Sequence, residues 1–252
     1  MGKIIAVANQ KGGVGKTTTC VNLSAALSEL GLKVLLCDMD PQGNATSGLG
    51  VDKNLEPNVY DVLIGRSTTE DAIVKTKFGD VLSSNMVLSG GADEIGRMDL
   101  GAREYVLKKV LKKVRGEYDY ILVDCPPTLG LLTLNSLCAA DTVLIPVQCE
   151  YFALEGLTDL MRTLKMIKKQ LNPALEIEGV LLTMYDGRTN FSAQVAAEIK
   201  KFFKQKTYNV AIPRNVRLSE APSHGVPIIA YDRPSRGSVA YMELAKEITK
   251  QN

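Results

Sequence analysis

The stretch Lys11-Gly-Gly-Val-Gly-Lys-Thr-Thr18 directly follows the apolar run Ile4-Ile-Ala-Val-Ala8. A buried strand that turns through glycines into Gly-Lys-Thr is typical of a P-loop, whose backbone N–H groups and helix N-terminus bind nucleotide phosphates. A glycine-rich turn without a ligand is the alternative, but it rarely yields Gly-Lys-Thr after a buried strand. A second lysine, Lys11, stands five residues ahead of the usual one, Lys16. Its position suggests a nucleotide bridged between two subunits.

The composition of the loop indicates what each part does. Three glycines let backbone N–H groups approach phosphate oxygens, and the helix that begins near Lys16 points its positive dipole end at them. Lys16 supplies charge to the β- and γ-phosphates, and Thr17 supplies a hydroxyl for Mg²⁺. The predicted ATP-binding residues of the loop are Lys11, Gly12, Gly13, Val14, Gly15, Lys16, Thr17 and Thr18.

Carboxylates follow two other predicted strands. Asp38 and Asp40 come after the second strand, and Asp124 follows the apolar run Tyr120-Ile-Leu-Val123. Ligands in open α/β sheets bind beyond the carboxyl ends of the strands, so all three side chains are expected to converge on the loop. One would hold Mg²⁺, and another could orient the attacking water. The sequence alone does not rank them, and Asp40 has helix capping as an alternative role.

Strand-like and helix-like segments alternate along the chain. This alternation predicts an α/β fold with a doubly wound, mostly parallel sheet and helices on both faces, in a single domain over residues 1–252. The region 43–100 is the least regular and is predicted to be insertion and surface structure. The predicted strands are 3–8, 33–38, 80–83, 119–124, 142–147, 177–183 and 208–212. The predicted helices are 16–30, 103–115, 130–138, 153–171, 191–205 and 236–250.

Composition narrows the class of protein. The chain has 252 residues, 45% of them hydrophobic, and no apolar run near the roughly 20 residues that cross a membrane. Its start lacks the pattern of a signal peptide. The five cysteines show no CxxC pairing, so reduced core thiols and a cytoplasmic location are expected.

Charge is unevenly distributed along the chain. The formal net charge is only +2, yet residues 188–252 hold 11 Lys/Arg and 5 Asp/Glu. This excess indicates that a C-terminal surface contacts an anionic partner, either nucleic acid or a membrane face. The alternative is a set of ordinary solvated lysines on helices.

The motifs carry a family resemblance that runs from end to end of the chain. The loop Lys11-Gly-Gly-Val-Gly-Lys-Thr17 resembles the deviant Walker A box of the ParA/MinD ATPases. Four further motifs resemble chromosomal ParA of the Soj type, the partner of a ParB/Spo0J protein. They are Asp38-Met-Asp-Pro-Gln-Gly-Asn-Ala-Thr-Ser-Gly-Leu-Gly50, Asp124-Cys-Pro-Pro127, Pro146-Val-Gln-Cys-Glu-Tyr-Phe-Ala-Leu-Glu-Gly156 and Pro213-Arg-Asn-Val-Arg-Leu-Ser-Glu-Ala-Pro222.

The resemblance implies roles for individual residues. Lys11 would reach across an ATP-sandwich dimer, supplying in trans a charge that is elsewhere worth roughly 10³–10⁵ in rate. Asp40 matches the aspartate associated with water activation. Asp38 lies in the same box, and Asp124 matches the Walker-B position, so Thr17, Asp38 and Asp124 are the expected Mg²⁺ residues. Three further residues are implied to contact the nucleotide, Glu150 across the dimer and Pro213 and Asn215 at the adenine.

The same resemblance implies a function. The implied protein is a weak ATPase. Its ATP-bound homodimer would bind double-stranded DNA non-specifically, and a ParB/Spo0J-like protein would stimulate its ATP hydrolysis. The resemblance also implies a nucleoid-associated protein in chromosome or plasmid segregation, with a link to replication initiation. Arg188 and Arg217 match positions linked with DNA binding, and Lys246 and Lys250 share a helix face four residues apart. Surface ion pairs are the alternative for the two arginines.

Other activities occur on the same fold. A MinD-like membrane ATPase is the main rival, but it carries an amphipathic C-terminal tail, and here the sequence ends at Asn252 directly after the predicted last helix. Apolar residues recur in that helix at Val239, Met242, Ala245 and Ile248, as in a helix docked on a core. No stable membrane association is therefore expected. An iron–sulphur scaffold and a metabolic ATP-dependent ligase are further alternatives.

Overall fold

The computed structural model describes residues 1–150 and 153–250, so Tyr151 and Phe152 of the fourth motif lie outside the described residues. One eight-stranded sheet has the order β3-β4-β2-β5-β1-β6-β7-β8. Neighbouring strands are parallel except for β3 and β4. The strands are β1 Lys3–Val7, β2 Val34–Asp38, β3 Ile73–Val74, β4 Asp80–Leu82, β5 Tyr120–Asp124, β6 Thr142–Gln148, β7 Glu176–Tyr185 and β8 Thr207–Pro213.

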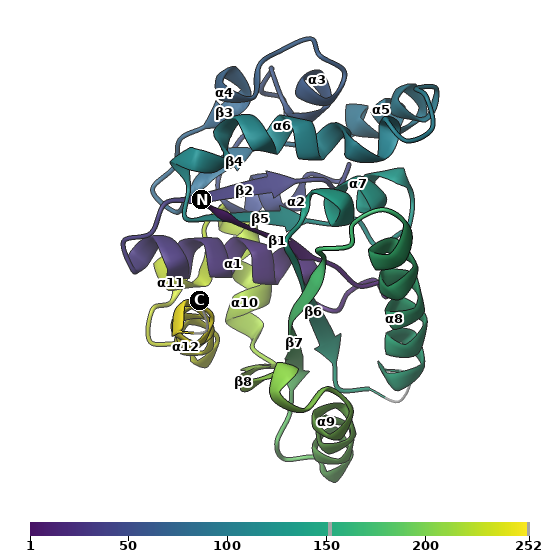
Figure 1. Cartoon of the computed structure of the whole chain (residues 1–252). Helices are drawn as coiled ribbons and strands as arrows, with labels where there is room; N and C mark the ends of the chain where they lie inside the picture. Colours follow the sequence, from purple (N-terminus) through teal and green to yellow (C-terminus); the bar gives the residue numbers. More distant parts are fainter. Residues whose placement is uncertain (151–152, 251–252) are drawn as a thin grey trace.

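Helices cover both faces of this sheet (Figure 1). Successive residues of a strand point to opposite faces, so Ile4 and Ala6 of β1 join one core while Ile5 and Val7 join the other. This double burial confirms the predicted doubly wound sheet. The helices of the first core are α3 Val59–Leu63, α5 Val87–Gly96, α6 Val106–Val114, α7 Leu131–Ala139, α8 Ala153–Gln170 and α9 Asn190–Phe203. Those of the second are α1 Lys16–Glu29, α2 Asn44–Gly48, α10 Val216–Glu220, α11 Ile228–Tyr231 and α12 Arg236–Lys250.

The region 43–100 is part of the core, and its prediction as surface insertion is wrong. The predicted strand 80–83 is present as β4, which pairs with β2 and is extended by the antiparallel β3. Short helix α4 Thr69–Ala72 leads into β3, and the side chains of Leu82, Leu88 and Ile95 are fully buried. The two-residue strand β3 is too short for alternation to reveal it in the sequence.

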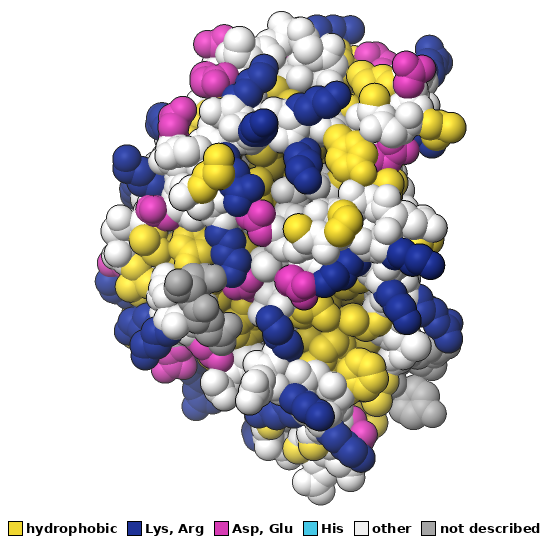
Figure 2. Space-filling view, in the orientation of Figure 1, with side chains coloured by type: hydrophobic (Ala, Val, Ile, Leu, Met, Phe, Trp, Pro, Cys, Tyr) yellow, Lys and Arg dark blue, Asp and Glu magenta, His cyan; other side chains and the backbone are white. Residues whose placement is uncertain are grey.

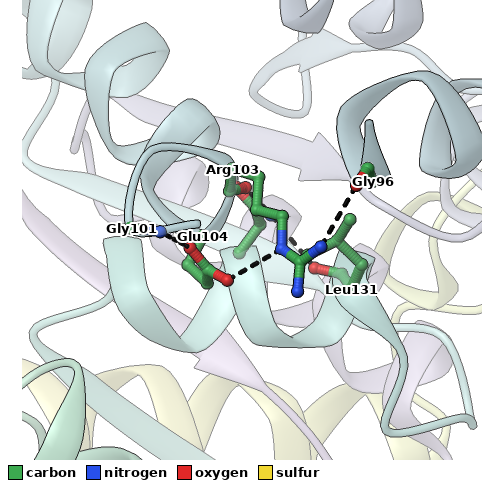
Figure 3. A network of polar contacts seen from close by, with 6 residues as sticks. Gly96, Gly101, Arg103, Glu104 and Leu131 are labelled. Carbon is green, nitrogen blue, oxygen red and sulfur yellow. Dashed lines mark hydrogen bonds and ion pairs between the residues drawn. The ribbon is translucent and has the colours of Figure 1, made fainter. Parts of the chain in front are cut away.

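The connection between α5 and α6 is fixed by side chains (Figure 3). Arg103 donates from Nε to Glu104 Oε1 at 3.0 Å and from a terminal nitrogen to the Gly96 carbonyl at 3.1 Å. The other Glu104 oxygen accepts from the Gly101 N–H at 2.9 Å. These bonds tie the segment between the two helices to the C-terminal end of α5.

The last helix docks on the core largely through the predicted face, since Ala245 and Ile248 are fully buried and Met242 packs against the core. Val239 is 47% exposed, whereas Tyr241 and Leu244 are buried together with Ile248. The Tyr241 hydroxyl lies 3.2 Å from Thr19 Oγ1 and so joins α12 to α1. Within the described residues, no helix combines the length and apolar character needed to cross a bilayer. All five cysteines are buried and free, as predicted.

Candidate nucleotide site

The loop between β1 and α1 is anchored to the two strands beside it. Asn9 donates to the Pro146 carbonyl of β6 at 2.7 Å and accepts from the Lys11 N–H at 3.0 Å. Thr183 of β7 donates its hydroxyl to the Val14 carbonyl at 2.8 Å. The loop is therefore held in place by long-range hydrogen bonds, a form of preorganisation that reduces the cost of binding.

Glycines shape the loop at two positions of positive φ. Gly13 has φ of 72° and Gly15 of 90°, a region that only glycine enters at low cost. Helix α1 then begins at Lys16 and directs its unpaired N–H groups into the turn. Gly12 and Gly13 are exposed, and a Cβ on either would meet no atom within 4 Å. The rim of the loop is thus open.

Lys16 is the buried cation of the loop. Lys16 is 7% exposed, and its Nζ donates to the Lys11 carbonyl at 3.3 Å. Burial lowers the pKa of Lys16, while the nearby Asp124 carboxylate acts in the opposite direction. A desolvated ammonium with one weak partner is well suited to bind an anionic phosphate.

Asp38 and Asp124 end neighbouring strands and lie side by side, as predicted. The β2–β5 register pairs the two residues directly, and both are fully buried. Burial raises the pKa of Asp38 to about 6. Burial, and then the charge of Asp38, raises the pKa of Asp124 well above its usual range. Two close carboxylates without a cation favour protonation.

The two carboxylates differ in their hydrogen bonds. Asp38 Oδ2 accepts from both the N–H and the hydroxyl of Thr46 at 2.8 Å, and Oδ1 accepts from the Asp40 N–H at 3.1 Å. Asp124 Oδ2 is buried and has no hydrogen-bond partner, and Oδ1 accepts from the Cys20 thiol at 3.5 Å. The open oxygen of Asp124 fits a direct ligand of Mg²⁺, whereas Asp38 is largely satisfied by the protein.

This geometry fits a magnesium ion shared with a nucleotide. Among the described residues, no group of three or more His, Cys, Asp or Glu side chains forms a metal cage. Mg²⁺ commonly takes one or two protein ligands and completes its shell with phosphate oxygens and water. The Thr17 side chain lies beside Asp124, and this interaction acts to lower the pKa of the carboxyl and so favours its ionised form. Thr17 and Asp124 are therefore the residues that would hold the ion.

Removing the Asp124 charge is expected to stabilise the metal-free protein. Asp124→Asn keeps the shape and removes a buried carboxylate, which should raise the free energy of unfolding by about 1–2 kcal/mol. The pKa of Asp124 is raised in the folded protein, so ionising this carboxyl destabilises the fold at any pH above the unfolded pKa near 4. This destabilisation grows as the pH rises. The stabilisation from Asp124→Asn should therefore be larger at pH 8 than at pH 5. Urea unfolding in EDTA measures it. A loss of stability at pH 8 would contradict this account of the site.

Asp40 lies in the loop after β2 and is partly exposed. Its Oδ1 accepts from the Gln42 N–H at 3.0 Å, which closes a local turn. The residue that precedes α2 is Gly43, in a left-handed conformation. Asp40 therefore does not cap the helix, and its second carboxylate oxygen remains available at the edge of the site.

Lys11 and Glu150 contact each other at the rim. Lys11 Nζ lies 2.6 Å from Glu150 Oε2, and the side chains are 39% and 46% exposed. The resemblance implies a separate nucleotide contact for each of them. Their ion pair within one subunit could not be predicted from the sequence, because the two residues are 139 positions apart. An ion pair this exposed contributes about 0–1 kcal/mol, so it can be exchanged for other contacts at small cost.

A cavity of about 560 Å³ adjoins the loop and contains the two residues predicted at the adenine. Gly15 and Thr18 line it from the loop, and Pro213 and Asn215 from the end of β8. Asn215 Oδ1 caps α10 by accepting from the Arg217 N–H at 2.8 Å. The volume is typical of small-molecule sites and accommodates a base beside the phosphate loop.

The four predicted DNA-binding residues do not form one cluster. Arg188 and Arg217 follow β7 and β8 at the carboxyl edge of the sheet, where they pair with Asp186 at 2.8 Å and Glu220 at 2.9 Å. Lys246 and Lys250 are exposed near the end of α12, beside the start of β8. In the view of Figure 2, Lys and Arg side chains are spread across the face rather than gathered in one patch.

The fold and this site define a P-loop nucleotide-binding protein. A family model described as AAA domain matches residues 2–177. The chain is 57% identical over 251 residues to "Sporulation initiation inhibitor protein Soj" of Bacillus subtilis, covering 98% of both chains. It is 50% identical over 251 residues to "Chromosome partitioning protein ParA" of Caulobacter vibrioides, covering 98% of this chain and 93% of the relative. The chain belongs to the ParA/Soj family of chromosome-partitioning proteins.

A solved structure supports the fold and the cofactors. It is named Cobyrinic Acid a,c-diamide synthase from Mycobacterium smegmatis and holds ADP and magnesium. Its TM-score to this chain is 0.87 at 38% identity, over 100% of this chain and 95% of that one. The prediction of ATP and Mg²⁺ agrees with these bound groups. Because this structure is named as a synthase, an ATP-dependent ligase remains an alternative activity for the fold.

Proposed function

We propose that this chain is an ATP-dependent partitioning ATPase, acting as one domain over residues 1–252. ATP with Mg²⁺ would produce a homodimer that binds double-stranded DNA non-specifically. A ParB/Spo0J-like partner would then stimulate hydrolysis and release, in a cytoplasmic, nucleoid-associated cycle. The 50% identity to a relative named for chromosome partitioning supports this proposal.

The open rim of the loop is the observation that supports a dimer most directly. Lys11 and Glu150 stand at this rim, more than one third exposed. The adjacent Gly12 has free space around it. A second subunit can therefore approach the phosphates closely, and the weak Lys11–Glu150 pair would not prevent it.

Within one subunit, the chain's own residues would divide the work. Lys16 and the loop N–H groups would bind the phosphates, and Thr17 and Asp124 would hold Mg²⁺, which neutralises phosphate charge when bound. Asp40, with a free carboxylate oxygen at the edge of the site, would orient the attacking water. Lys11 of a second subunit would stabilise the charge that develops on the transferred phosphoryl group.

Reversing the charge of Arg188 is expected to remove DNA retention. Arg188 is 89% exposed, so Arg188→Glu should leave ATP binding and dimerisation intact and lower the salt slope of DNA binding by about 1 for each lost phosphate contact. Gel shifts with ATP at several salt concentrations measure this. Arg162→Glu is a matched control, because Arg162 is also an exposed arginine in an ion pair, 78% exposed beside Asp159. Equal losses in both variants would indicate a general charge effect instead of a site.

One experiment separates the proposed function from its rivals. The protein is sedimented with ATP or ADP, with non-specific DNA or anionic liposomes, at two salt concentrations. ATP-dependent, salt-sensitive association with DNA is the expected result. ATP-dependent association with liposomes would instead favour the MinD-like activity. ATP consumption that requires ammonia or glutamine and an acid substrate would favour a ligase.

A further inference from the structure

Four residues form a closed ring of hydrogen bonds behind the site. The Ser84 N–H donates to Thr46 Oγ1 at 2.9 Å, and the Thr46 hydroxyl donates to Asp38 Oδ2 at 2.8 Å. Asp38 Oδ1 accepts from the Asp40 N–H at 3.1 Å. The ring closes where Ser84 Oγ donates to the Asp40 carbonyl at 2.9 Å.

The ring joins three separate parts of the fold. Asp38 ends β2, Thr46 lies in α2, and Ser84 follows β4. All three side chains are fully buried. The Thr46 hydroxyl has a single proton, which Asp38 accepts, while its lone pair accepts from Ser84. Both uses together fix the hydroxyl in one orientation.

Asp40 is the member of the ring that reaches the edge of the site. Its N–H is bound by Asp38 and its carbonyl by Ser84, so the ring fixes the peptide groups on both sides of this residue. The Asp40 side chain projects from that fixed backbone. A misplacement of about 1 Å at a reacting centre can reduce a rate about 10²-fold. The position of the Asp40 carboxylate should therefore affect how well it orients the attacking water.

We propose that Thr46 is a positioning residue for ATP hydrolysis, which acts through Asp38 and Ser84 on the placement of Asp40. The proposal rests on the proposed function, in which Asp40 orients the attacking water. Thr46 itself makes no contact with the nucleotide in this account. Its loss should therefore reduce kcat while nucleotide affinity is kept.

The first test replaces Thr46 with residues that differ only in the hydroxyl. Thr46→Val keeps the shape and breaks both side-chain bonds of the ring; kcat should fall about 10–100-fold with ATP affinity within about twofold. Thr46→Ser keeps the hydroxyl and should restore most of the rate. Ser83→Ala is the matched control, because the neighbouring Ser83 hydroxyl is buried without a partner, and this variant should hydrolyse ATP normally.

The second test asks whether Thr46 acts through Asp40. Single-turnover hydrolysis is compared in wild type, Thr46→Val, Asp40→Ala and the double variant. We expect the double variant to be no slower than Asp40→Ala, because residues that act as a unit are not additive. Additive losses would overturn the proposal and leave Thr46 a purely structural residue.

The outcomes distinguish the two levels of inference. If Asp40→Ala hydrolyses ATP normally, the role of Asp40 in the proposed function fails, and the ring fails with it. If Asp40→Ala is inactive but Thr46→Val is normal, only the ring is overturned. Should Thr46→Val melt too low to assay, Ser84→Ala removes just the bond to the Asp40 carbonyl, and it must then lower kcat in the same way.

Discussion

Lys16→Ala is expected to weaken ATP binding severely. Lys16 is 7% exposed, burial lowers the pKa of its ammonium, and the hydrogen bond from Nζ to the Lys11 carbonyl is long at 3.3 Å. Phosphate would replace that weak partner with a buried, charge-assisted bond. Truncating such a pair typically costs about 2–5 kcal/mol, which corresponds to a loss of affinity of roughly 30-fold to several thousandfold.

Titration with a fluorescent ATP analogue measures the loss. Lys33→Ala is a suitable control, because Lys33 is an exposed lysine at the opposite edge of the sheet. The fold should survive the change at Lys16, since the substitution removes a buried charge that burial already disfavours. Normal ATP affinity in a folded Lys16→Ala protein would contradict the assignment of the loop as the nucleotide site.

The parts of the site that sequence predicted are those defined by local pattern. The P-loop is a contiguous motif, and Asp38 and Asp124 each follow a continuous apolar strand. Parallel strands end at one edge, so their convergence follows from the fold class alone. Ranking the two carboxylates was not possible, because the difference depends on which protein donors reach them. Asp38 receives three, and one oxygen of Asp124 receives none.

The parts that sequence missed depend on contacts between distant segments. Thr46 lies inside a recognised motif, but its role depends on Ser84, which is 38 residues away in a region predicted to be surface insertion. The strand β3 has two residues and is defined by its antiparallel pairing with β4, so its own sequence pattern did not predict it. Lys11 and Glu150 are likewise brought together only by the order of β1 and β6 in the sheet.

Lys11→Ala is expected to leave ATP bound but to slow hydrolysis by about 10³–10⁵, the size of effect that a cation supplied in trans has in phosphoryl transfer. That range corresponds to roughly 4–7 kcal/mol of transition-state stabilisation. The contact Lys11 makes within its own subunit is far weaker, since the exposed pair with Glu150 is worth about 0–1 kcal/mol. A large loss in rate would therefore reflect the second subunit, and steady-state phosphate release measures it.

Mixing two inactive variants distinguishes action in trans from action in cis. A Lys11→Ala subunit keeps Lys16 and can bind ATP, while a Lys16→Ala subunit keeps Lys11 and can offer it to the partner. A mixed dimer holds one ATP and has one complete site. When that single ATP sustains random pairing, half of the dimers in an equimolar mixture are mixed, so up to about a quarter of wild-type activity should return. If Lys11 acts only within its own subunit, neither protein can repair the other, and the mixture stays as inactive as its components. Recovery that rises and falls with the mixing ratio would assign the catalytic lysine to the neighbouring subunit.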